Sequence, residues 1–245
     1  MVNLSIIIPA YNEEKSIGRT LRGLVNFFDH QPAYNYEIVV VDDGSRDRTA
    51  RVVRATPHAL VRLVRSKRTY GKGHALRLGV KAARGELITF VDAGGDFQPD
   101  NILRCLKLME ALDADIVIGS KRHPMSRVNY PLKRQILSRI YQIVIHLLFN
   151  LKVRDTQTGL KVFKAQVLKI IFPRVLVKQY AFDLELLVIA NHLGFHRISE
   201  APVDLDFNTA STGINNSTIR GIIQDTLAIF YRLYILRWYD KSRRL

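Results

Sequence analysis

The sequence predicts an α/β protein built on a mainly parallel sheet. Runs rich in β-forming residues alternate with segments of helical hydrophobic spacing through the first 120 residues, a pattern typical of right-handed βαβ units. Several of these runs end abruptly in acidic residues beside Gly or Asn. No repeat, low-complexity tract or change of composition divides the chain, so 1–245 is expected to form a single domain.

The expected elements follow one another along the chain. Short apolar runs bounded by turn residues predict strands at 4–8, 37–41, 61–64, 87–91 and 115–120. Apolar residues at helical spacing predict helices near 17–28, 49–53, 75–83, 132–151 and 180–194, and over the last thirty residues. Asp47 or Thr49 can cap the second helix, and the basic segment 67–74 is expected to be a loop.

The charge of the chain is unusual. Its 37 basic and 22 acidic residues give a formal net charge of +15, which predicts an anionic partner: a phosphorylated substrate, an acidic membrane surface or nucleic acid. Nucleic acid is disfavoured because the basic residues are not interleaved with aromatics along one element and no nucleic-acid motif is present. A dinucleotide oxidoreductase is disfavoured because no Gly-x-Gly-x-x-Gly follows the first strand.

The single cysteine, Cys105, excludes an internal disulfide and a cysteine-based zinc cluster. It lies in an expected helix and is most simply a small core residue. The N-terminus lacks the basic start and long apolar core of a signal peptide. No window offers about 18 uncharged apolar residues, so the protein is expected to be cytoplasmic and not to cross a membrane.

Polar residues at the strand ends are expected to meet at one edge of the sheet, because parallel strands share the edge at which they end. The segments concerned are 9–13, 42–43 and 92–96. Ligands of open α/β sheets bind beyond this edge. Asp92 and Asp96 can hold a hard cation through oxygen ligands, although Asp and Gly are also ordinary turn residues. Together the three segments favour a site for metal and nucleotide over a set of solvated turns.

Four motifs in order give the chain its resemblance to a known family: Pro9-Ala10-Tyr11-Asn12-Glu13-Glu14, Asp42-Asp43-Gly44-Ser45, Gly71-Lys72-Gly73-His74-Ala75-Leu76 and the Asp92 loop. The chain resembles the family 2 glycosyltransferases from about Leu4 to about Val203, and within them the dolichyl-phosphate and polyprenyl-phosphate hexosyltransferases. The resemblance implies a GT-A type fold, a UDP- or GDP-hexose donor, Mg²⁺ or Mn²⁺, and inversion at the sugar carbon.

The resemblance also implies which residues bind the donor. Those expected to bind the nucleotide sugar are Pro9, Ala10, Tyr11, Asn12, Glu13, Asp42, Asp43, Lys72, Asp92 and Ala93. Tyr11 is available to pack on the base, and Lys72 could reach a phosphate as a point charge. The metal motif of the family is Asp-x-Asp, but Gly94 occupies the second acidic position here, so the expected metal ligands are Asp92 and Asp96.

The expected catalytic residues are Asp92, Gln157, Lys161 and Asp183. The resemblance places Gln157 and Lys161 in a loop that faces the reacting phosphates, and Asp183 at the position of a catalytic base. An Asp near a helix N-terminus is often only a cap. A lipid phosphate, whose second pKa is about 6, is already ionised at neutral pH and needs little help from a base.

Two segments are expected to touch a membrane surface. The segment 132–151 is basic first and then apolar, and relatives place a membrane-associated helix there; a buried core helix is the alternative. In the last thirty residues, an apolar and aromatic stripe accompanies many Arg and Lys residues. These helices could instead pack on the core or on a second copy of the chain, which would make the protein a homo-oligomer.

The expected function is therefore inverting transfer of glucose or mannose from a nucleotide sugar to a polyprenyl or dolichyl phosphate, at the cytoplasmic face of a membrane and in cell-envelope or protein glycosylation. The expected parts are a donor half at 1–120, an acceptor half at 121–210 and an amphipathic C-terminal helix at 215–245. The alternatives are a family 2 enzyme with a saccharide or protein acceptor and, in a different class, a basic nucleic-acid-binding protein.

Overall fold

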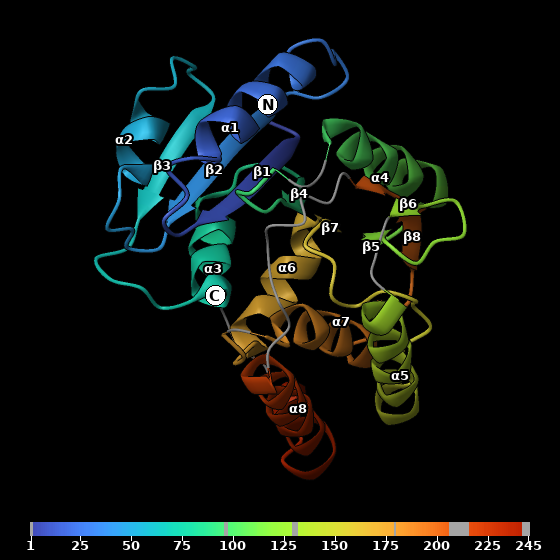
Figure 1. The fold of residues 1–245 in the computed structure, drawn as a ribbon. Coiled ribbons are helices and arrows are strands. Elements are labelled where there is room, and N and C mark those ends of the chain that lie inside the picture. Colours follow the sequence, from blue (N-terminus) through green and yellow to red (C-terminus); the bar gives the residue numbers. More distant parts are fainter. Residues whose placement is uncertain (1, 96–97, 129–131, 179, 206–215, 242–245) are drawn as a thin grey trace.

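The computed structural model describes residues 2–95, 98–128, 132–178, 180–205 and 216–241. A seven-stranded sheet has the order β3-β2-β1-β4-β7-β5-β8 (Figure 1). Its strands are β1 (Leu4–Ala10), β2 (Tyr36–Asp42), β3 (Val61–Arg65), β4 (Leu87–Phe90), β5 (Ile116–Ser120), β7 (Lys161–Lys164) and β8 (Ile198–Pro202). Two short strands, β6 (Arg127–Val128) and β9 (Asp204–Leu205), pair in parallel as a separate ribbon.

Eight α-helices are described: α1 (Ile17–Phe28), α2 (Thr49–Arg54), α3 (Lys72–Ala82), α4 (Pro99–Leu112), α5 (Leu132–Phe149), α6 (Ala165–Ile171), α7 (Phe182–His192) and α8 (Asn216–Phe230). A π-helical turn (Tyr231–Ile235) and a 3₁₀ turn (Trp238–Asp240) follow α8, and another 3₁₀ turn (Phe172–Arg174) follows α6. Within the part of the chain that the structure describes, no helix has both the length and the apolar character needed to cross a bilayer.

The predicted mainly parallel sheet is confirmed, with one exception. Strand β7 runs antiparallel to both of its neighbours, β4 and β5, whereas the other pairings in the sheet are parallel. Strand β7 therefore starts at the edge where β4 ends, with Lys161 opposite Phe90. This reversal brings the loop before β7 beside the loop after β4.

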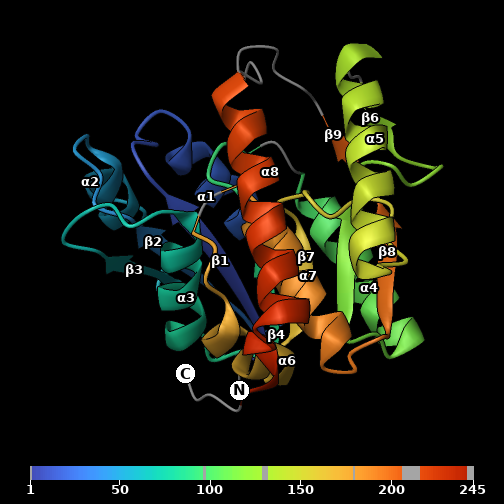
Figure 2. The same cartoon turned by 90° about the horizontal axis from the view of Figure 1, so that it is seen from below.

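Alternate residues of the strands point into two cores, one on each face of the sheet. From β1, Ile7 joins a core with α3, α6 and α7, while Ile6 and Ile8 join a second core with α1 and α4. Cys105 lies fully buried in the second core, as expected. Helices α5 and α8 lie beside one another beyond α7 (Figure 2), and both contribute residues to the first core.

Two expected boundaries are wrong. Lys72 was expected in a loop, but α3 begins at this residue, because Gly71, with φ +100°, lets the chain turn sharply into the helix. Residues 216–241 do not form one continuous amphipathic helix. Helix α8 ends at Phe230, a π-helical turn follows it, and Arg237 takes a left-handed conformation with φ +46° that ends the helical path.

Candidate active site

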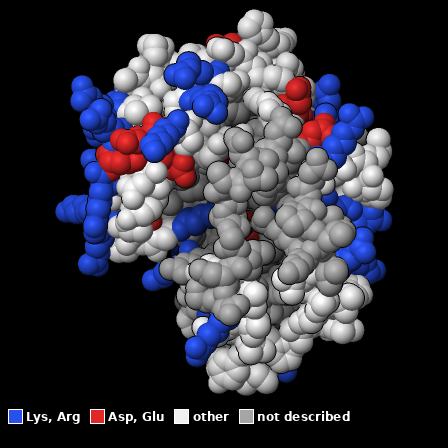
Figure 3. Space-filling view, in the orientation of Figure 1, with Lys and Arg blue, Asp and Glu red and all other residues white. Residues whose placement is uncertain are grey.

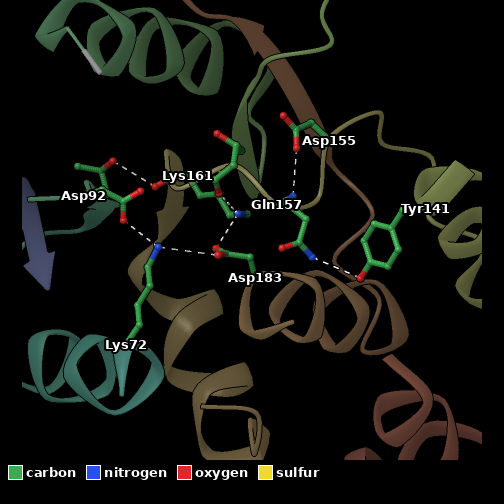
Figure 4. A network of polar contacts seen from close by, with 9 residues as sticks. Lys72, Asp92, Tyr141, Asp155, Gln157, Lys161 and Asp183 are labelled. Atoms are coloured by element: carbon green, nitrogen blue, oxygen red, sulfur yellow. Dashed lines mark hydrogen bonds and ion pairs between the residues drawn. The ribbon is translucent and has the colours of Figure 1, made fainter. Parts of the chain in front are cut away.

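A row of four charged side chains lies at the carboxyl edge of the sheet (Figure 4). The Lys72 Nζ atom is 2.8 Å from Asp92 Oδ1 and 4.0 Å from Asp183 Oδ2. On the other side of Asp183, Oδ1 accepts a hydrogen bond of 2.7 Å from Lys161 Nζ. Charges therefore alternate in sign along the row, which stabilises each ion.

Four different elements supply this row. Lys72 is the first residue of α3, Asp92 follows β4, Lys161 opens β7 and Asp183 lies in the first turn of α7. The Asp183 carboxylate points to the two lysines (Figure 4), so a simple helix-cap role does not describe it. The four residues are far apart in the sequence, and only the reversed strand β7 brings Lys161 to this edge.

The Lys72–Asp92 pair is charged and accessible. The Lys72 ammonium lowers the pKa of Asp92. Burial alone would lower the pKa of Lys72, but the charges of Asp92 and Asp183 overcome it and raise that pKa. The two side chains keep 33% and 40% of their surface exposed. A ligand can therefore reach both ions without unfolding the site.

Lys161 has a different environment. Its side chain has no exposed surface, and burial lowers its pKa against the opposing charge of Asp183. The ammonium donates to the Thr158 carbonyl as well as to Asp183. The sequence places Lys161 toward the reacting phosphates, whereas the structure places its ammonium behind Asp183, where it holds that carboxylate in place.

Gln157 lies apart from the row, next to α5. Its backbone N–H donates to Asp155, and its side-chain Nε2 donates to the Tyr141 hydroxyl over 3.4 Å (Figure 4). The Tyr141 hydroxyl also shares a hydrogen bond of 3.0 Å with Thr226 of α8. Burial raises the pKa of Tyr141. This tyrosine therefore joins the loop before β7 to both α5 and α8, a role that the sequence pattern does not reveal.

The segment after β1 is fixed by the loop after β2. Asn12, with φ +57°, donates its N–H to the Ser45 hydroxyl, and its side-chain oxygen accepts the Arg46 N–H. The Glu13 N–H donates to Thr49. Tyr11 between these anchors is 44% exposed. The turn is thus held rigidly while its aromatic ring stays free to pack on a planar ligand.

Asp42 and Asp43 organise the loops around them. Asp42 Oδ1 accepts the Ser45 N–H. Asp42 Oδ2 lies 2.9 Å from Arg65 Nε and forms an ion pair with it, but the geometry is not that of a hydrogen bond. The Asp43 carboxylate accepts the N–H groups of Tyr70 and Gly71. Beside them opens a polar groove of about 590 Å³, lined by Gly44, Ser45, Arg46, Arg65, Ser66, Lys67, Arg68 and Thr69.

The remaining predicted residues are placed as follows. Pro9 and Ala10 end β1, and the Ala93 carbonyl accepts a hydrogen bond of 2.9 Å from the Thr20 hydroxyl. Asp96 lies outside the described residues. Within the described ranges, no three acidic, His or Cys side chains converge as a metal site. Of the two predicted metal ligands, Asp92 and Asp96, only Asp92 is among the residues that the structure describes.

The fold is that of the GT-A type glycosyltransferases. A crystal structure of glucosyl-3-phosphoglycerate synthase from Mycobacterium tuberculosis with Mn²⁺, UDP-glucose and phosphoglyceric acid superimposes with a TM-score of 0.71, at 18% identity, covering 94% of this chain and 79% of that one. The same enzyme with Mg²⁺ and UDP gives 0.70. The expected GT-A type fold is confirmed.

The sequence comparison defines the family. The model of glycosyl transferase family 2 matches residues 5–172, and the chain belongs to this family. A dolichyl-phosphate beta-glucosyltransferase of Trichomonas vaginalis is 34% identical over 99% of this chain and 77% of its own length. An enzyme of the same name from Dictyostelium discoideum is 30% identical over 98% and 78%.

Proposed function

We propose that this glycosyltransferase moves glucose from UDP-glucose to a polyprenyl or dolichyl phosphate at the cytoplasmic face of a membrane. The names of its relatives support the sugar and the acceptor. The observation that carries the proposal is the accessible Lys72–Asp92 pair, which the loop before β7 joins to two helices with exposed apolar surfaces. A polar donor site beside an apolar surface suits a reaction between a nucleotide sugar and a lipid.

The donor nucleotide would lie over the ends of β1 and β2. Tyr11 would pack on the base, and the rigid turn 12–13 would line the ribose together with Asp42 and Asp43. Their carboxylates already accept hydrogen bonds from loop N–H groups, so they would shape the pocket as well as meet the ligand. Lys72 would leave its bridge to Asp92 and neutralise the diphosphate, because the diphosphate carries more negative charge than one carboxylate and accepts charge-assisted hydrogen bonds.

The site fits a divalent cation in its donor chemistry. Asp92 is a carboxylate with 40% of its surface exposed, and Mg²⁺ and Mn²⁺ prefer oxygen ligands, keeping several waters and binding substrate phosphates. Asp92 would hold the ion together with Asp96 and the diphosphate. When bound, such an ion supplies positive charge that stabilises the departing nucleotide.

In the transfer step, a phosphate oxygen of the acceptor attacks the anomeric carbon of glucose. The bond from that carbon to the diphosphate breaks, UDP leaves with the electron pair, and the configuration inverts. The acceptor phosphate is ionised at neutral pH, so the attack does not require Asp183 to act as a general base. We assign to Asp183 the role of fixing the positions of the Lys72 and Lys161 ammonium groups. Gln157 would face the acceptor.

The acceptor would approach from the membrane side. Helices α5 and α8 lie in contact, since Phe149 packs on Phe230 and the Tyr141 hydroxyl shares a hydrogen bond with Thr226. The Tyr234 hydroxyl, in the π-helical turn after α8, also donates to the Leu148 carbonyl. The outer faces of the two helices and of this turn expose large apolar side chains: Leu137, Ile140, Ile143, Val144, Leu147, Ile223, Leu227, Tyr231, Tyr234 and Ile235. We call this set the apolar face. The surface over α8 carries little charge, with Lys and Arg at its sides (Figure 3), as a bilayer interface favours.

Purified protein tests the proposal with UDP-glucose and GDP-mannose as donors and polyprenyl phosphate in liposomes as acceptor. UDP release that requires both UDP-glucose and the lipid phosphate, and yields a glucosylated lipid, is the expected result. Equal or greater turnover with soluble saccharides would overturn the lipid acceptor. Turnover of GDP-mannose alone would overturn the donor.

A further inference from the structure

We infer that Glu185 is a positioning residue for the donor phosphates, because it joins the C-terminal segment 231–240 to the loop 175–178 that supports Lys72. Glu185 lies on α7 and has no exposed surface. The inference rests on the proposed function, since it takes Lys72 as the residue that meets the donor diphosphate.

One oxygen of Glu185 holds the loop 175–178. Its Oε2 accepts the backbone N–H groups of Leu176 at 2.8 Å and Val177 at 2.7 Å. Hydrogen bonds to an ionised acceptor are stronger than neutral ones. Two successive N–H groups on one oxygen fix the orientation of this short stretch of backbone.

The loop 175–178 in turn supports the start of α3. The Lys178 carbonyl accepts the Gly73 N–H at 3.2 Å, and the Val175 carbonyl accepts a hydrogen bond of 2.7 Å from Arg77. The loop 175–178 approaches the start of α3 too closely for a side chain at Gly71 or Gly73, the two neighbours of Lys72. A Cβ added at Gly71 would lie 2.9 Å from the Lys178 carbonyl oxygen, and one at Gly73 would lie 2.9 Å from that of Val177.

The other oxygen of Glu185 binds the C-terminal segment. Its Oε1 accepts a hydrogen bond of 2.8 Å from Arg232, in the π-helical turn, and one of 2.6 Å from the hydroxyl of Tyr239, which is fully buried. Both partners follow α8, whose outer surface belongs to the apolar face. Glu185 is thus bonded on one side to the segment after a membrane-facing helix and on the other to the loop beneath Lys72.

Packing alone does not explain an acid at this position. The neighbours of Glu185 on α7 are apolar and buried, among them Phe182, Leu184, Leu186 and Leu187. Burial raises the pKa of Glu185, although the hydrogen bonds from Tyr239 and the loop and the charge of Arg232 oppose this. A buried carboxylate is costly unless its partners are all in place. Its four donors come from the two segments that it joins, which is the arrangement that a positioning role requires.

Removal of the Tyr239 hydroxyl tests the inference without emptying the core. Tyr36→Phe is the matched control, because Tyr36 is also buried and donates a 2.6 Å hydrogen bond to a carboxylate, that of Asp29, at a distant part of the fold. Binding of UDP in the presence of Mn²⁺, the KM for UDP-glucose, kcat and Tm are measured. Tyr239→Phe should weaken UDP binding and raise KM by about 3- to 10-fold. Tyr36→Phe should change neither and should lose less Tm, because the Asp29 carboxylate is 44% exposed and can bond to water instead.

A double-mutant cycle provides the second measurement. If Tyr239 and Glu185 act through Lys72, then Tyr239→Phe should have no further effect on UDP binding in the Lys72→Met background. Glu185→Gln should resemble Tyr239→Phe; should it fail to fold, Tyr239→Phe decides. Effects that simply add in the Lys72→Met background, or UDP binding that follows the control, would overturn this inference alone. A wild-type protein that binds no UDP would overturn the proposed function with it.

Discussion

Gly159 lies directly against Asp92. A Cβ added to this glycine would stand 2.0 Å from Asp92 Oδ2, far inside contact distance. Because β7 is antiparallel to β4, the loop that contains Gly159 runs back past the end of β4 and covers one side of the carboxylate. Lys72 binds the other oxygen of Asp92. The glycine and the lysine together fix the direction in which this acid points.

Gly159→Ala should therefore displace Asp92 and reduce kcat by about 100-fold, because misplacement of a reacting group by about 1 Å has effects of this order. The protein should remain folded, since the Asp92 side chain is partly exposed and can move. Turnover and Tm are measured together. Gly23→Ala is the control, because a Cβ there meets nothing within 4 Å; equal activity of the two variants would contradict the prediction.

Activity should depend on a divalent cation. Asp92→Ala should lower turnover by about 1,000-fold or more, because it removes a metal ligand and the partner of Lys72. Asp96→Ala should also be severe, since Gly94 offers no second carboxylate in the motif. Turnover is followed with Mg²⁺, with Mn²⁺ and with chelator. Unchanged turnover in chelator, or near-normal Asp96→Ala, would show that the metal assignment is wrong.

The Lys72–Asp92 pair should make stability depend on acidic pH. Lys72 holds the pKa of Asp92 below its ordinary value of 3.8. A carboxyl with a lowered folded-state pKa stabilises the fold above the ordinary value, and this contribution is lost as the pH falls through the lowered one. The free energy of unfolding of Asp92→Asn should thus fall below that of wild type by about 0.5–1 kcal/mol above pH 5, a small difference because both side chains are partly exposed.

Urea unfolding from pH 2.5 to 7 checks this dependence. The difference between wild type and Asp92→Asn should shrink as the pH falls below 3.8, because Asp92 takes up a proton first in the unfolded state. The charge of Lys72 does not change in this range, because its raised pKa lies far above it. A constant difference across the whole range would mean that the charge of Asp92 does not contribute to stability.

The parallel part of the fold was predictable because its signals are local. The strands at 4–8 and 37–41 are largely apolar runs, as strands buried between two neighbours need to be, and the less buried strand at 61–64 pairs with one neighbour at the sheet edge. The direction of β7 is not a local property, since the same four residues could pair in either sense. The left-handed conformation of Arg237 ends the C-terminal helical path, and no Gly or Pro near this position in the sequence predicts it.

The site was predictable in composition but not in detail. Motif residues such as Lys72 and Asp92 lie where strand ends meet, so their approach follows from the sheet. The buried position of Lys161 depends on its long-range contact with Asp183 of α7, which spacing does not encode. Tyr141 and Glu185 were missed because each looks like an ordinary member of an amphipathic or apolar helix, and only their partners on distant segments distinguish them.

Truncation after Gly221 would not test membrane attachment alone. It would remove Asp225, which accepts the Ala181 N–H at the start of α7, as well as Arg232 and Tyr239. The truncated chain should therefore lose several kcal/mol of stability, because Glu185 is left buried without its partners. A melting curve checks this; an unchanged Tm would contradict the role assigned to the C-terminal segment.

Point charges on the apolar face test the membrane directly. Leu147→Glu and Ile235→Glu place a carboxylate at sites that are 76% and 63% exposed, so folding should be little affected. Flotation with anionic liposomes should fall by about 10-fold or more, because the apolar insertion into the bilayer is lost. Leu112→Glu, at a 55% exposed site on α4, is the control. Activity on lipid acceptor should fall with flotation while UDP affinity stays constant.

High salt should release the wild-type protein from liposomes only partly, since screening weakens the Lys and Arg contribution alone. Wild-type protein that stays off liposomes at low salt would refute the membrane assignment.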